Sequence, residues 1–292
     1  MNQTARLVFD CQCALGEGPI WHPGRQKLFF FDINAETLYS VRADGSLADQ
    51  WLFNEIVAAA AIVDDETLLL ATETGLKGFQ IATGGLAPIH AIEADNPATR
   101  TNDSRVHPSG AFWIGTMDKG PAEAPLGALY HYRHGQLTTL KTDVAIPNAT
   151  CFSPDGRIAY WTDTPTRRIL KVATDPETGL PIGDWQLFAD VSDGPGYPDG
   201  AVVDAEGYLW NARWGGSCVV RHAPDGSVDR VVELPVSQVT CPAFGGPDLK
   251  TLFITTANKN MSPDQLAAEK IAGGLFAIDL DIAGLPEARV SL

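Results

Sequence analysis

The feature that most constrains the fold is a repeat that runs through the whole chain. Each unit holds an apolar strand, a tight turn carrying Pro, Asp or Gly, and a second strand rich in aromatic residues, as in residues 20–24 followed by 28–31. The turn positions are Pro23, Asp65, Pro108, Pro154, Ala205 and Pro247. They are separated by 42, 43, 46, 51 and 42 residues, close to the length of a four-stranded propeller blade. Six turns predict an all-β chain folded as a six-bladed β-propeller, with a β-sandwich as the alternative.

The repeat assigns residues 1–292 to one propeller domain. The apolar strand at 274–279 comes late in the last unit, so the N-terminal strand at 7–9 is expected to close the ring beside it. Weak helical spacing at 263–271 predicts a short helix on the rim. A closed ring leaves few exposed strand edges, and this favours a monomer.

Charge and hydropathy exclude several classes of partner. The chain has 21 basic and 36 acidic residues, a net charge of −15, which would repel nucleic acid and acidic membrane surfaces. The longest apolar run, at 56–63, is far shorter than the ~20 residues of a spanning helix. The first residues lack the apolar stretch of a secretory signal, and the five scattered cysteines suggest no disulfide framework. We therefore expect a cytoplasmic protein with no membrane or nucleic-acid partner.

One position in each repeat indicates a functional site. The residues six positions before the turns are Glu17, Ala59, Asn102, Asn148, Asp199 and Cys241. Equivalent positions in a propeller face the central channel, where a carboxylate without a partner is costly to bury. Two carboxylates with amide oxygens form a ligand set for a hard divalent cation, and the absence of histidine from this phase disfavours a histidine-based zinc site. Asx-turns between strands are the alternative explanation.

Short motifs in the same order as in a known family carry a resemblance over residues 7–290. They are found at residues 16–21, 100–103, 115–117, 147–148, 197–200, 244–246 and 272–275. In this set the chain resembles the SMP-30/gluconolactonase/regucalcin family, and its bacterial pentonolactone and aldonolactone hydrolases in particular. Animal members carry a substrate-holding glutamate directly after the Gly-Thr-Met motif, whereas this chain has Asp118, Lys119 and Gly120 there.

The resemblance implies a six-bladed propeller that holds one divalent cation and hydrolyses sugar lactones. Glu17, Asn148 and Asp199 would be the metal ligands, and Arg100 and Asn102 would bind substrate. The cation is left open among Ca, Mg, Mn, Fe(II) and Zn. The small-molecule partner would be a pentono- or hexonolactone, opened to the aldonic acid in carbohydrate oxidation.

Chemistry assigns provisional roles to three of these residues. Asp199 is the candidate catalytic general base, because a ligand carboxylate keeps a second oxygen that can accept a proton. Arg100 offers forked donors to substrate oxygens, with a surface salt bridge as its alternative role. Asn102 could instead hold the cation through water. Two other functions remain open: an esterase or phosphotriesterase at the same metal site, and a non-catalytic calcium-binding regulator.

Overall fold

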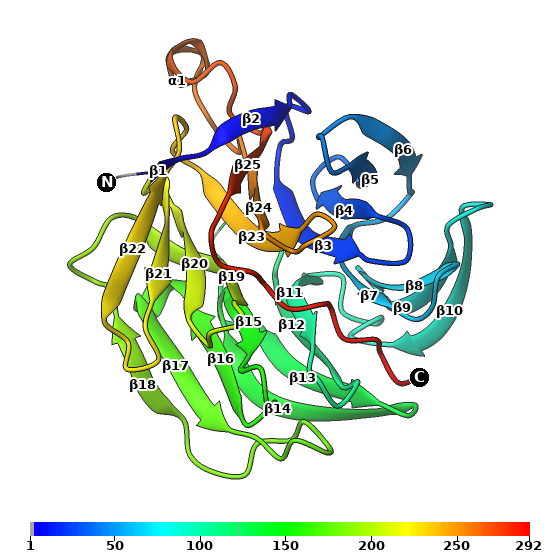
Figure 1. The fold of residues 1–292 in the computed structure, drawn as a ribbon. Coiled ribbons are helices and arrows are strands. Elements are labelled where there is room, and N and C mark those ends of the chain that lie inside the picture. Colours follow the sequence, from blue (N-terminus) through cyan, green and yellow to red (C-terminus); the bar gives the residue numbers. More distant parts are fainter. Residues whose placement is uncertain (1–2, 122) are drawn as a thin grey trace.

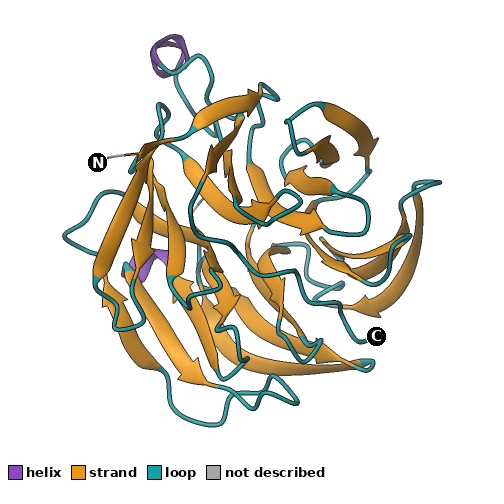
Figure 2. Ribbon diagram, in the orientation of Figure 1, coloured by secondary structure: helices purple, strands orange, loops and turns teal. Residues whose placement is uncertain are grey.

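The computed structural model describes residues 3–121 and 123–292, and it confirms the six-bladed β-propeller. Six sheets are arranged around a common axis, as Figure 1 shows, and each blade begins with the strand nearest that axis. Loops and turns supply nearly all the remaining structure (Figure 2). No helix in the described residues is long and apolar enough to cross a lipid bilayer.

The first three blades follow one another without interruption. Blade 1 contains β3 (Gly16–His22), β4 (Lys27–Asp32), β5 (Thr37–Arg42) and β6 (Leu47–Leu52). Blade 2 contains β7 (Val57–Ile62), β8 (Thr67–Thr72), β9 (Gly75–Gln80) and β10 (Gly85–Ala91). Blade 3 contains β11 (Thr99–Val106), β12 (Phe112–Asp118), β13 (Gly127–Arg133) and β14 (Gln136–Val144).

The last three blades add the short helices and the N-terminal strands. Blade 4 contains β15 (Pro147–Phe152), β16 (Ile158–Asp163), the 3-10 helix η1 (Thr164–Thr166), β17 (Arg168–Ala173) and β18 (Gln186–Asp190). Blade 5 contains β19 (Tyr197–Val203), β20 (Leu209–Trp214), β21 (Cys218–His222), β22 (Val228–Glu233) and the parallel strand β1 (Gln3–Thr4). Blade 6 contains β23 (Val239–Gly245), β24 (Thr251–Thr256), α1 (Pro263–Ala268), β25 (Leu275–Asp279) and β2 (Arg6–Phe9).

Strand β2 joins the two ends of the ring. It pairs antiparallel with β25, with Arg6 opposite Ala277, and forms the outer strand of blade 6. The chain then continues directly into blade 1, so blade 6 is built from both termini of the sequence. The C-terminal segment crosses the ring, from a bridge between Gly284 and Asp204 to a bridge between Arg289 and Ile62 (Figure 1).

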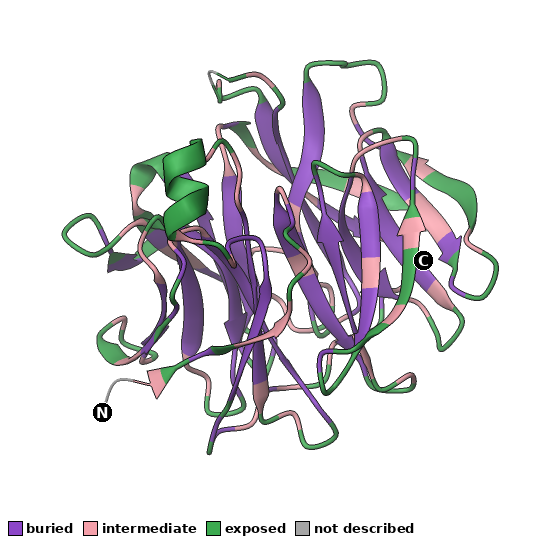
Figure 3. Ribbon diagram, turned by 90° about the horizontal axis from the view of Figure 1, so that it is seen from above, coloured by how far each residue is buried: buried purple, intermediate pink, exposed green. Residues whose placement is uncertain are grey.

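The core lies between the blades. Because side chains alternate across a strand, the aromatic strand β4 packs Phe29 and Phe31 toward blade 2 but Leu28 and Phe30 toward blade 6. Each neighbouring pair of blades encloses one such apolar cluster. This burial on both faces explains why the second strand of each repeat is almost continuously apolar. Figure 3 shows the consequence, with buried inner strands and exposed connections.

The sequence correctly predicted a short helix on the rim. Helix α1 begins after a capping box in which Ser262 accepts a hydrogen bond from the backbone N–H of Gln265. It ends at Ala268, three residues earlier than the predicted limit. All its residues are accessible to solvent, and it projects from the ring in Figure 1.

Candidate functional site

A β-bulge at the same position in every inner strand aims side chains into the central channel. The register of each inner strand slips by one residue against its neighbour at this position. A bulge bends the strand and re-aims the extra residue. In β3 and β15 the residue after the channel side chain is left-handed, with φ +57° at Gly18 and +55° at Ala149. A left-handed alanine is strained, which is typical of a functional site.

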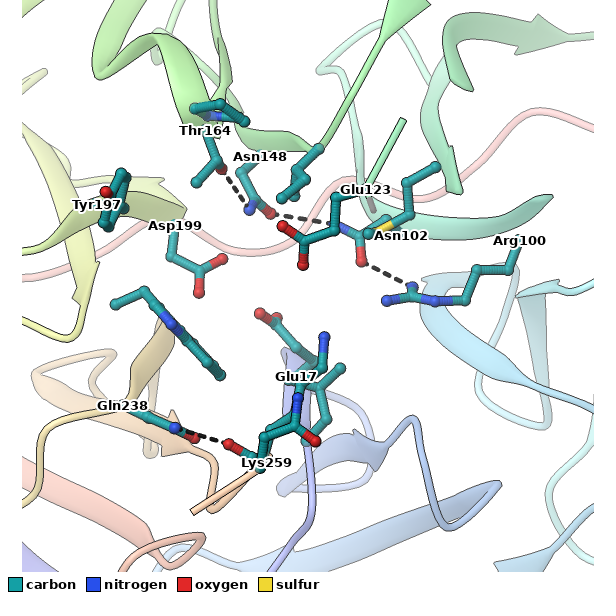
Figure 4. Close-up of a pocket in the computed structure, with 16 residues that line it drawn as sticks. Glu17, Arg100, Asn102, Glu123, Asn148, Thr164, Tyr197, Asp199, Gln238 and Lys259 are labelled. Atoms are coloured by element: carbon teal, nitrogen blue, oxygen red, sulfur yellow. Dashed lines mark hydrogen bonds between the residues drawn. The ribbon is translucent and has the colours of Figure 1, made fainter. Parts of the chain in front are cut away.

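The five sequence-predicted site residues lie around one cavity of about 570 Å³ at the end of the channel where the inner strands begin. Glu17, Asn102, Asn148 and Asp199 come from the bulges of β3, β11, β15 and β19, and Arg100 comes from the start of β11. Figure 4 shows the Glu17, Asn148 and Asp199 side chains pointing toward a common centre. The other lining residues are Leu15, Met117, Glu123, Ile146, Thr164, Pro165, Tyr197, Trp214, Gln238, Lys259 and Asn260.

Hydrogen bonds fix the orientation of the two asparagine amides. Asn148 donates from Nδ2 to Thr164 Oγ1 over 2.9 Å, and Thr164 donates to the Pro198 carbonyl over 2.9 Å. The Asn148 oxygen is therefore turned away from Thr164. Asn102 donates from Nδ2 to the Pro147 carbonyl at 2.9 Å and to Asn148 Oδ1 at 3.3 Å, and its own oxygen accepts from Arg100 at 2.8 Å. The Asn102 oxygen is thus engaged by the charged Arg100, whereas the Asn148 oxygen accepts one longer hydrogen bond from Asn102 and keeps a second lone pair for a ligand at the centre.

The two carboxylates of the site are buried close to one another. Burial, together with the charge of Asp103, raises the pKa of Glu17 to about 8. Burial and the neighbouring Glu17 raise the pKa of Asp199 well above its usual range. Glu17 accepts a hydrogen bond from the Gly18 N–H at 2.9 Å. A bound cation would relieve the repulsion and the desolvation of both groups.

Arg100 is a buried group of the site. It is 7% exposed and forms no ion pair in the described chain with Asp95 or Asp103, the acids near it in sequence. Its Nη1 donates to the Thr101 carbonyl and to Asn102, whereas Nε and Nη2 have no hydrogen-bond partner among the described residues. Burial lowers its pKa to about 10, which keeps the side chain charged at neutral pH. Asp103 instead accepts from the Thr150 N–H at 2.7 Å and ties blade 3 to blade 4.

The donor set fits a hard divalent cation. Two carboxylates and an amide oxygen converge in a partly open cavity, which leaves room for water and substrate oxygens. Three His, Cys, Asp or Glu side chains suited to a metal are not gathered anywhere in residues 3–121 and 123–292. Mixed carboxylate and amide ligands suit calcium, magnesium or manganese.

Several lining residues were missed from the sequence because they come from blade connections with no common phase. Thr164 begins η1, and its only signal is the polar Thr-Asp-Thr run at 162–164 that ends β16. Glu123 comes from the loop after β12 and lines the cavity a few residues after Met117. Asp118, at the position itself, accepts the backbone N–H groups of Gly120 and Ala124 and shapes this loop.

Comparisons with known proteins agree with this architecture. Residues 15–258 match the model of the SMP-30/gluconolactonase/LRE-like family. The chain is 38% identical to the L-arabinolactonase of Azospirillum brasilense, over 98% of this chain and 95% of that one. It is 36% identical to the pentonolactonase of Haloferax volcanii, over 98% of each. A crystal structure from Agrobacterium tumefaciens described as a calcium-binding protein, regucalcin, is 38% identical and superposes with a TM-score of 0.96, over 100% of this chain and 99% of that one.

The names of the enzymes among these relatives agree with the predicted class, a hydrolase of cyclic esters. The resemblance found in the sequence motifs is confirmed over nearly the full length. The chain belongs to the SMP-30/gluconolactonase/LRE-like family.

Proposed function

We propose that this protein is a divalent-metal-dependent sugar lactonase that opens an aldonolactone to the aldonic acid. The observation that carries the proposal is the pair of buried carboxylates, Glu17 and Asp199, that meet the Asn148 amide oxygen in a cavity with a forked cationic donor. A lactone carbonyl needs polarisation, a positioned water and a proton acceptor, and this cavity offers residues for each requirement.

Glu17, Asn148 and Asp199 would hold the cation. When bound, a divalent cation acts as a Lewis acid on the ester carbonyl and offsets the negative charge that develops there. The three side chains come from different blades, so the rigid ring of inner strands fixes their spacing. Thr164 orients Asn148 from behind.

Asp199 is the proposed general base. One carboxylate oxygen accepts a proton from the water whose oxygen forms the new bond to the carbonyl carbon. As the carbonyl carbon releases the ring oxygen, the same carboxyl group returns the proton to that oxygen. The Asp199 carbonyl accepts a hydrogen bond at 2.8 Å from the buried Asn211, which anchors the backbone of this residue during both transfers.

Arg100, Asn102 and Glu123 are the proposed binding residues for the lactone ring. The free Nε and Nη2 of Arg100 can donate to ring hydroxyl or carbonyl oxygens, while Glu123 can accept from hydroxyl groups. Asn102 holds the Arg100 fork in place through its 2.8 Å hydrogen bond. These donors and acceptors favour a polyhydroxylated substrate over an aryl ester or a phosphotriester. The names of the arabinolactone and pentonolactone relatives support the same choice.

A calcium-binding regulator is the second candidate, because the Agrobacterium relative is described as a calcium-binding protein. That function uses the same ligands but needs no proton acceptor. It predicts tight calcium binding with no lactone turnover.

Hydrolysis of pentono- and hexonolactones by Asp199→Asn tests the proposal. We expect the variant to lose at least about a hundredfold in kcat, because a positioned base contributes ~10²–10⁴ in rate. Asp193→Asn, which removes an exposed carboxylate from the connection between β18 and β19, is the control and should match the wild type. An Asp199→Asn protein with wild-type turnover contradicts the assignment of the base.

A further inference from the structure

The cavity is larger than the lactone ring proposed to react in it. At ~30 Å³ per water-sized group, a five-membered lactone with its carbonyl and two ring hydroxyls, about eight groups, fills ~240 Å³. The cavity measures about 570 Å³, so the ring does not fill it. Arg100 and Gln238 lie on opposite sides of Glu17 in Figure 4. A ring held by Arg100 therefore leaves the side near Gln238 free.

Gln238, Lys259 and Trp214 line this far side of the cavity. Gln238 precedes β23, and its backbone is fixed by a bridge to Trp214 and by a 2.9 Å hydrogen bond from the Ala257 N–H. Its side chain is fixed as well, because Nε2 donates to the Lys259 carbonyl at 2.9 Å. The far side is thus a preorganised wall made by blades 5 and 6.

The polar atoms of this wall are incompletely paired. Gln238 Oε1 is buried and has no hydrogen-bond partner within the described residues. The Lys259 ammonium likewise has no ion-pair or hydrogen-bond partner in residues 3–121 and 123–292. A buried acceptor without a partner is unfavourable. Gln238 lines the cavity, so a ligand there can supply that partner when the amide turns toward it.

Gln238 and Lys259 line the same cavity, and an unpaired acceptor together with an unpaired cationic donor fits a hydroxyl group. A hydroxyl donates one hydrogen bond and accepts others, so it can donate to Gln238 and accept from Lys259. An anionic group has no proton to give to Gln238 Oε1. Trp214 adds an apolar ring edge or face against which carbon atoms of a sugar can pack.

We infer that Trp214, Gln238 and Lys259 form a second subsite that binds the exocyclic hydroxyl groups of the substrate, and that this subsite selects 1,4-lactones with a polyol side chain. The inference rests on the proposed lactonase function. It extends that function from the reacting ring to the part of the sugar that distinguishes one aldonolactone from another.

Two substrates isolate the contribution of this subsite. A hexono-1,4-lactone carries an exocyclic diol, whereas a tetrono-1,4-lactone has the same type of ring with no exocyclic carbon. The selectivity is the ratio of their kcat/KM values, and we expect the wild type to favour the hexonolactone. Removing one hydrogen bond to the side chain should lower this ratio by about tenfold in Gln238→Met and in Lys259→Met. Turnover of the tetronolactone should stay within about twofold, because its ring contacts are unchanged.

Lys270→Met is the matched control. Lys270 is exposed and lies on the same connection between β24 and β25 as Lys259, so its replacement makes the same change in charge away from the cavity. It should keep the wild-type ratio. Lys259→Met keeps the test valid if Gln238→Met fails to fold, because Lys259 belongs to a surface loop.

The outcomes separate the two levels of the proposal. A wild-type ratio in both cavity variants, or an equal loss in Lys270→Met, overturns the subsite and leaves the lactonase standing. A wild type that opens neither lactone with any divalent cation overturns the proposed function and the subsite with it.

Discussion

Thr164 connects the fold to the proposed metal site, and its hydroxyl can be removed with little change in shape. Thr164→Val deletes the group that accepts from Asn148 Nδ2 and donates to the Pro198 carbonyl, each over 2.9 Å. Asn148 is 4% exposed, so its amide N–H would lose its partner in a buried position. An unpaired buried polar group costs ~1–3 kcal/mol, and we expect a loss of ~2 kcal/mol in the free energy of unfolding.

The larger effect should fall on cation affinity. Without Thr164, the Asn148 amide can turn its nitrogen toward the centre, where a donor replaces the ligand oxygen. Loss of an orienting partner of a metal ligand typically weakens binding by ~10–100-fold. Thr164→Ser keeps the hydroxyl and should restore most of the affinity.

Isothermal titration of the metal-stripped protein with divalent cations measures this effect directly. Thr162→Val is the control, because Thr162 is also buried in blade 4 and donates to the Arg168 carbonyl at 2.8 Å, away from the cavity. Thr162→Val should destabilise the fold without lowering the affinity for the cation. If Thr164→Val binds the cation with wild-type affinity, Thr164 does not orient Asn148 as a ligand.

Three further predictions concern charge, recognition and packing. The pKa of Glu17 is about 8 in the folded chain against a usual value of 4.5, so the folded state holds this proton more tightly than the unfolded state. In denaturant titrations, the unfolding free energy of metal-stripped protein should therefore fall as the pH rises from about 4.5 to 8. A flat profile, or the same profile in Glu17→Gln, contradicts this. Arg100→Lys replaces the planar fork by a point charge and should raise KM by about tenfold with a smaller effect on cation affinity; equal losses in both would indicate a structural role. Gly200→Ala would place its Cβ 2.3 Å from Cys241 Sγ. This overpacking should lower the free energy of unfolding by ~1–3 kcal/mol and displace Asp199. An unchanged melting temperature would refute the packing argument.

The fold could be predicted from the sequence because its physical causes are repetitive. Every blade needs a tight turn and a strand that is buried on both faces. The run Leu28–Phe31 is apolar throughout because it packs against both neighbours of blade 1. The channel-facing position of each blade could also be predicted, because a bulge at the same point of each inner strand puts Glu17, Asn148 and Asp199 in equivalent places. Because the blades repeat, a position identified in one blade can be located in the others.

The rest of the cavity does not share that periodicity. Glu123, Thr164 and Lys259 come from connections of different length and shape, each with its own backbone path. Their place depends on long-range packing, such as the hydrogen bond from Gln238 to the Lys259 carbonyl across the gap between two strands. The residues that would set substrate choice are therefore less visible in the sequence than those that would hold the cation.

The most direct test of the central claim is to restore one divalent cation to metal-stripped protein while following both cation binding and lactone hydrolysis. The account predicts no turnover above the spontaneous rate without cation, and recovery in proportion to binding that saturates at one cation per chain. It also predicts that Glu17→Gln weakens both together. Full hydrolysis by the stripped protein, or cation binding by Glu17→Gln with wild-type affinity, would contradict it.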